Sequence, residues 1–199
     1  MRHTLSGKRR LALAGTTTLC VLAFAVPAAA QTGGSGPPGG TTTTTTTPTT
    51  TPAPVGPPGK ARIRKDGTAV APADAPSAVQ SAIAAANAIH TLPYVWGGGH
   101  RTFFDSGYDC SGAVSYVLHA AGMLSSPMTS GALASSWGVP GKGRWITVYG
   151  NASHAYMVIA GKRYDTSSGG DRWNQGSGPR WRKKKRAPAG YTQKYFPGY

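Results

Sequence analysis

The chain has 199 residues and a formal net charge of +15, from 21 Lys and Arg against six acidic residues, all of them aspartate. This length allows one or two domains, and so basic a chain is expected to associate with polyanions. Its two cysteines, Cys20 and Cys110, exclude a scaffold held by several disulfides.

The first thirty residues have the layout of a secretory signal, with four basic residues, an apolar run over 11–26 and Ala28 to Ala30 at the end. The apolar run is shorter than the roughly 20 residues of a membrane-spanning helix. We therefore predict a signal peptide over 1–30 and a secreted, extracellular protein, in preference to an uncleaved anchor. Cleavage leaves a net charge of +11 and Cys110 as the one cysteine.

Composition divides the rest of the chain. Residues 31–59 are almost wholly Thr, Pro and Gly, which offer too little apolar surface to offset the entropy of ordering them. We predict a disordered linker there, a basic connecting segment over 60–75, and one folded domain over 76–199.

Periodic apolar positions predict a helix from Pro76 to about Thr91, because its apolar residues recur at three-to-four spacing. A loop with three consecutive glycines, Gly97 to Gly99, follows. A second helix is expected to begin near Cys110, with Asp109 as its N-cap and Gly122 at its C-terminal end.

Strands dominate the later sequence. After a short helix around 130–137, we predict strands over 144–149, 153–160 and 162–166, separated by short turns. Helices that precede strands favour an α+β fold with a segregated antiparallel sheet over a doubly wound parallel fold.

Cys110 is a candidate nucleophile because the amides and positive dipole end of a helix N-terminus favour a thiolate. A negative neighbour, Asp109, opposes this unless its carboxylate caps the helix. Four histidines remain after cleavage as possible bases, and His154 is preferred because it begins a long apolar strand. Asp165 closes the next strand, where it is expected to orient the His154 ring. On spacing alone, a second interpretation stays open, in which Cys110 is an inert buried thiol, His154 a surface histidine and Asp165 a loop aspartate.

Three sequence motifs carry a family resemblance. Residues 93–98 (PYVWGG), 108–112 (YDCSG) and 153–161 (SHAYMVIAG) resemble the NlpC-type cell-wall cysteine peptidases, a branch of the papain-like superfamily. The resemblance covers about 75–167. It implies an α+β papain-like domain that cuts peptidoglycan stem peptides, with Cys110 as nucleophile, His154 as base and Asp165 as the third residue. It also implies that Tyr94 reaches into the site and that the backbone around Cys110 and Ser111 supports the oxyanion.

Two features depart from the family pattern. Lys142 stands where the family usually has an acidic residue before the histidine strand, and the third residue is more often histidine than aspartate. Two other classes therefore stay open: a non-catalytic wall-binding protein, and a related cysteine amidase or acyltransferase.

The densest charge run, Arg180 to Arg186 (RWRKKKR), has two interpretations. It is either an adhesive segment for anionic wall polymers, with Trp181 available for stacking, or a solvated mobile loop. Nucleic acid is not expected as an intended partner, and a monomer is expected. No cysteine or histidine spacing suits a metal, so neither metal nor cofactor is predicted.

Overall fold

The structure is a computed structural model that describes residues 56–172 and 176–199. The predicted signal peptide and nearly all of the predicted linker lie outside the described residues. Within the described part, no helix is both long enough and apolar enough to cross a membrane.

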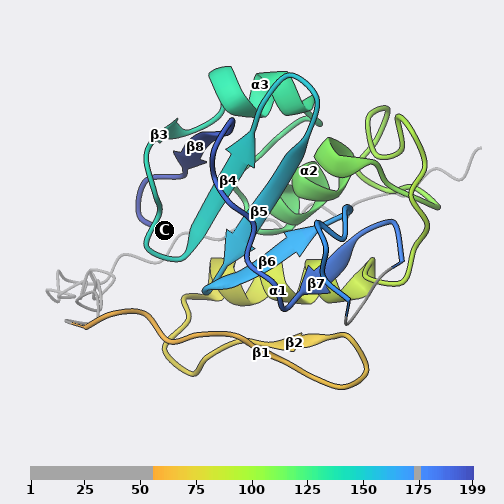
Figure 1. The fold of residues 1–199 in the computed structure, drawn as a ribbon. Helices are drawn as coiled ribbons and strands as arrows, with labels where there is room; N and C mark the ends of the chain where they lie inside the picture. The colour runs from red at the N-terminus through yellow and green to blue at the C-terminus, as the bar shows by residue number, and fades with distance from the viewer. Residues whose placement is uncertain (1–55, 173–175) are drawn as a thin grey trace, which may run out of the picture. The chain divides into compact units, whose positions relative to one another are not determined.

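Three helices form one layer of the domain (Figure 1): α1 (Ser77–Ala88), α2 (Cys110–Ala120) and α3 (Ser130–Ser135). The apolar side of α1, including Val79 and Ile83, is buried as the spacing predicts. Helix α2 ends before Gly122, whose φ of 72° provides the left-handed turn that stops the helix. All three helices lie where the sequence predicts them.

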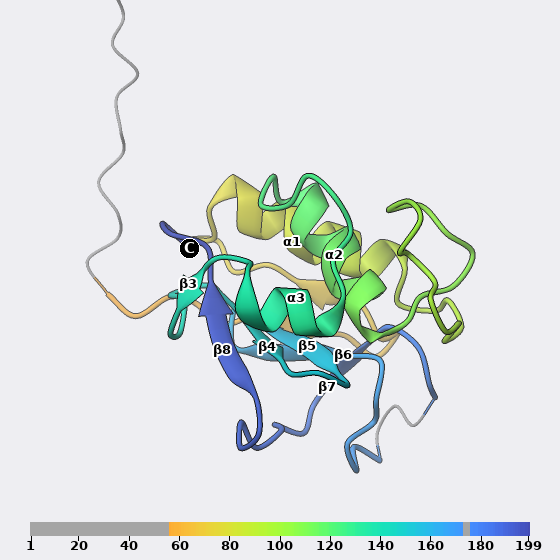
Figure 2. The ribbon, with the colours of Figure 1, turned by 90° about the horizontal axis from the view of Figure 1, so that it is seen from above.

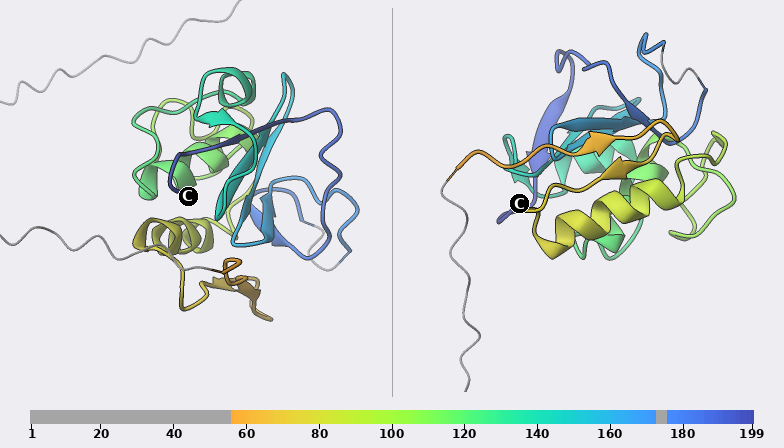
Figure 3. Two further views of the ribbon diagram at one scale, coloured as in Figure 1. Left: turned by 90° about the vertical axis from the view of Figure 1, so that its left-hand side faces the viewer. Right: turned by 90° about the horizontal axis from the view of Figure 1, so that it is seen from below.

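A six-stranded antiparallel sheet forms the second layer, in the order β3-β8-β4-β5-β6-β7. Figures 2 and 3 show the helices gathered on one face of this sheet. The bounds are β3 (Val139–Pro140), β4 (Ile146–Gly150), β5 (Ala155–Ile159), β6 (Lys162–Asp165), β7 (Arg180–Arg182) and β8 (Thr192–Tyr195). The architecture is thus α+β, as expected from the order of the elements.

Alternation along the central strands separates a core face from an outer face. Val148, Met157 and Tyr164 belong to the core cluster that also contains the helix residues. Because side chains alternate along a strand, Tyr156 of β5 and Asp165 of β6 lie on the opposite, outer face. The outer face therefore carries one of the predicted site residues.

Residues 60–75, expected as a connecting segment, form a hairpin of β1 (Arg62–Ile63) and β2 (Ala69–Val70). Ala69 is buried in the core, and the side chain of Asn87 on α1 bonds both its amide and its carbonyl at 2.8 Å. The segment packs on α1 because this asparagine acts as a surrogate strand partner. Two-residue strands are too short to show a recognisable sequence period.

The basic run, Arg180 to Arg186, is not a solvated loop throughout. Its first three residues form β7, and Trp181 and Arg182 are buried. Trp181 donates its ring N–H to Asn87 of α1 at 2.8 Å, so it is not available for stacking on a ligand. Stacking by Trp181 and a solvated loop over β7 are therefore wrong, because Trp181 and Arg182 are buried in an edge strand of the sheet, while adhesion through the rest of the run stays a prediction.

Candidate active site

Cys110 is the first residue of α2 and is buried. The preceding Asp109 has extended backbone and accepts a hydrogen bond from the Gly112 amide at 2.8 Å. The carboxylate is thus turned onto the helix amides, which is the arrangement in which it least opposes a negative charge on the Cys110 sulfur.

Asp109 also binds a histidine that the sequence analysis did not place in the site. His100 Nε2 lies 3.0 Å from Asp109 Oδ1 and 3.0 Å from the Ser111 hydroxyl oxygen. Gly97 donates its amide to Asp109 Oδ2 at 3.2 Å. The Ser111 hydroxyl therefore takes part in the capping network, so any support that Ser111 gives an oxyanion must come from its backbone amide.

Close packing of glycines holds this loop on α2. A Cβ added to Gly112 would lie 1.9 Å from the Gly98 carbonyl oxygen, so the glycine loop and the first turn of α2 touch backbone to backbone. Tyr94, at the start of the loop, pairs with Tyr108 and is partly exposed. Burial raises the pKa of the Tyr94 hydroxyl, and the negative charges of Cys110 and Asp109 raise it further.

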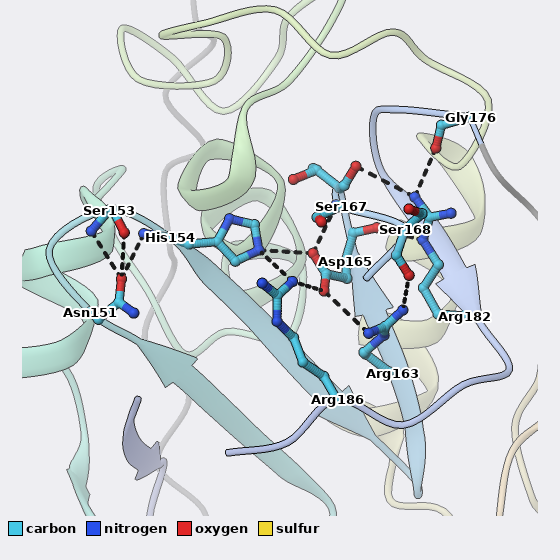
Figure 4. A network of polar contacts seen from close by, with 11 residues as sticks. Asn151, Ser153, His154, Arg163, Asp165, Ser167, Ser168, Gly176, Arg182 and Arg186 are labelled. Atoms are coloured by element: carbon cyan, nitrogen blue, oxygen red, sulfur yellow. Dashed lines mark hydrogen bonds and ion pairs between the residues drawn. The ribbon is translucent and has the colours of Figure 1, made fainter. Parts of the chain in front are cut away.

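His154 and Asp165 are brought together as predicted. The Asn151 side chain accepts the amides of Ser153 and His154, each at 2.9 Å, and so forms the turn that leads into β5. His154 Nε2 lies 2.9 Å from Asp165 Oδ1, a pair shown in Figure 4. The two residues come from adjacent antiparallel strands, so rigid backbone on both sides fixes the pair.

The electrostatics of His154 connect all three predicted residues. Burial lowers its pKa, but hydrogen bonds to Asp165 and to Cys110, together with the charges of both, raise it to about 9. Burial raises the pKa of Asp165, but the hydrogen bond and charge of His154 outweigh this and hold it below the usual 3.8. At neutral pH an imidazolium therefore lies between a carboxylate and the Cys110 sulfur.

Two arginines surround the other side of Asp165, whose side chain is fully buried. Arg186 Nη1 lies 3.0 Å from Asp165 Oδ2 and 3.5 Å from His154 Nε2 (Figure 4), and its guanidinium lies over the rings of Tyr156 and Tyr191. Arg163 Nη1 is 3.8 Å from the same oxygen. Arg186 was not expected here because the charge run was assigned to a separate surface segment, whereas Arg163 lies two residues before Asp165 on the same face of β6.

The described residues contain no group of three or more side chains suited to hold a metal ion. The chemistry available here is instead that of a buried thiol, a charged imidazole and a carboxylate in sequence, at the N-terminus of a helix. Such an arrangement suits nucleophilic attack on a carbonyl carbon.

Similarity to known proteins is found in structure and not in sequence. No family model matches the chain, and no curated protein matches its sequence. Among solved structures, a hypothetical invasion protein of Mycobacterium tuberculosis is similar at a TM-score of 0.43 and 22% identity, over 70% of this chain and 71% of that one. A histidine mutant of RipA, the resuscitation promoting factor interacting protein, is similar at 0.41 and 22%, over 59% and 63%.

Proposed function

We propose that the protein is a cysteine peptidase that hydrolyses peptide bonds in peptidoglycan stem peptides. The observation that carries the proposal is the 2.9 Å pair of His154 with buried Asp165, electrostatically coupled to Cys110 at the start of α2. The substrate class rests on the resemblance of the three sequence motifs to the NlpC-type peptidases. A basic chain with a predicted signal peptide is compatible with work in an anionic bacterial wall.

The charge state of the site sets the first step. His154 holds a proton at neutral pH, and its positive charge stabilises a negative charge on the Cys110 sulfur. The sulfur attacks the substrate carbonyl carbon, and the amides at the start of α2 face the oxyanion that develops. His154 then gives its proton to the leaving amine as the C–N bond breaks, which leaves a thioester on Cys110.

The second step returns the enzyme to its starting state. His154, now neutral, takes a proton from a water molecule that attacks the thioester carbon. The C–S bond breaks, the acid product leaves, and the imidazolium beside the sulfur is restored. Asp165 keeps the ring oriented and stabilises its positive charge in both steps.

Product analysis tests the proposal. Purified peptidoglycan is incubated with the wild type, with Cys110→Ala and with His154→Ala, and the released muropeptides are separated. Both variants should lose about three orders of magnitude or more in rate, because the two residues act as a unit. His119→Ala is the matched control, since His119 is an exposed histidine whose ring stacks on Phe103. Equal products from the wild type and Cys110→Ala would contradict the proposal, and cleavage of an amide other than a stem-peptide bond would redirect it to another substrate.

A further inference from the structure

The outer face of the sheet, opposite the helices, carries a groove. The chain after β7 crosses this face to reach β8, as the dark blue segment in Figure 1 shows. Two adjoining cavities of about 410 and 310 Å³ lie there and share five lining residues. The shared residues are Lys60, Lys142, Tyr149, Val158 and Gly161. We call the two cavities together the outer-face groove.

The charge in the outer-face groove is strongly unbalanced. Six basic residues line its larger cavity: Lys60, Lys142, Lys162, Arg163, Lys185 and Arg186. Among the described residues, no aspartate lines either cavity. Asp165 lies behind Arg163 and Arg186 and is buried, so it compensates one of these charges at most. Basic groups that line one cavity repel one another, and a multivalent anion bound between them offsets this repulsion.

Some buried polar atoms of the residues that line the larger cavity make no hydrogen bond. Arg163 is 3% exposed, and within the described structure its Nε and Nη1 make no hydrogen bond, although Nη1 lies 3.8 Å from the Asp165 carboxylate. Tyr156 is 1% exposed, and its hydroxyl is unpaired in the same part of the chain. Nearly all buried polar groups in proteins are hydrogen-bonded, so the incomplete pairing of these three atoms leaves the charge of Arg163 weakly compensated beside the cavity.

We propose that the outer-face groove binds phosphodiester groups of an anionic wall polymer, a function beyond the proposed hydrolysis. A phosphate directs oxygens in several directions, so one group contacts the partly exposed guanidinium of Arg186 and lysines at the rim together. The groove rings Tyr149 and Tyr156 are buried, which removes the stacking platform that single-stranded nucleic acids use. The predicted linker, 31–59, has no acidic residue and cannot neutralise the groove itself.

A pair of charge-matched variants tests the proposal. The full chain with Cys110→Ala is titrated in a calorimeter with inorganic phosphate and with poly(glycerol phosphate). Lys142→Gln/Lys185→Gln removes two groove charges, whereas Arg62→Gln/Lys65→Gln removes two exposed charges outside it. We expect the groove variant to bind the polymer about tenfold more weakly, and the control to change by less than about twofold.

Two other polyanions, matched in charge concentration, complete the design: polygalacturonate, which carries carboxylates alone, and duplex DNA. If the groove variant and the control variant weaken polymer binding equally, or if the protein does not bind the polymer, then the outer-face groove is not the binding site. Groove-dependent binding of polygalacturonate or DNA as tight as that of poly(glycerol phosphate) would overturn the ligand class. If the first groove variant does not give the wild-type thermal unfolding curve, Lys60→Gln/Lys162→Gln replaces it. None of these outcomes depends on peptidase activity, so the site and the proposed hydrolysis stand or fall separately.

Discussion

Removal of the Asp165 carboxylate should lower the pKa of His154 by a predictable minimum. That pKa rises from 6.5 to about 9 although burial lowers it, so the upward influences of Asp165 and Cys110 together exceed the net rise. Asp165 acts on His154 both through its hydrogen bond and through its charge, and its hydrogen bond is the largest of the influences that raise this pKa. Asp165→Ala should therefore lower the pKa of His154 by at least about 1 pH unit, on the order of 1 kcal/mol.

The assay is an NMR titration of the His154 ring proton, with Cys110→Ala in every sample so that only Asp165 differs. His154→Ala assigns the signal. Asp165→Asn should give an intermediate pKa, because the amide oxygen still accepts a hydrogen bond but carries no charge. The neighbouring Arg163 and Arg186 can only lower the pKa further once the carboxylate is gone. A fall of less than about half a pH unit would refute the idea that Asp165 holds the imidazolium.

Three further predictions concern stability. Gly112→Ala should lower the free energy of unfolding by more than about 2 kcal/mol, since the new Cβ meets the Gly98 carbonyl, whereas Gly131→Ala on α3 has open space and should be neutral or stabilising in the same urea titration. Asp109→Ala should lower the free energy of unfolding by about 1–2 kcal/mol because the helix cap is lost, whereas Asp109→Asn should keep most of that stability because its amide oxygen still caps the helix. Equal losses of stability in the two variants would show that the cap is not the cause. The pKa of His154 is higher folded than unfolded, so its contribution is complete below pH 6.5 and is lost as the pH rises through about 9. Unfolding free energy should thus fall by up to about 3 kcal/mol across this range in the wild type, and the fall should be absent in His154→Ala.

Strong local signals made much of the fold predictable. Helix α1 follows from apolar spacing, the start of α2 from the Asp109 cap, and β5 and β6 from apolar runs separated by a tight turn. The meeting of His154 with Asp165 also followed, since antiparallel neighbours with a short turn lie side by side.

Contacts between distant segments were not predictable. Arg186 reaches Asp165 across 21 positions in sequence, after the chain has left the sheet at β7 and crossed its outer face. A run of basic residues has no period that distinguishes a buried strand from a solvated loop, so Trp181 and Arg182 were placed at the surface. The His100 contact likewise depends on a glycine loop whose path no local pattern specifies.

The position of β8 bears on when the domain folds. This strand follows all the others in the sequence, yet it lies between β3 and β4. A chain that emerges N-terminus first cannot close the sheet until residues 192–195 are available, and pairings across such separations form slowly. Until β8 pairs, the segment that carries Arg186 is anchored at β7 alone, so the contact between Arg186 and Asp165 is expected to form late in folding.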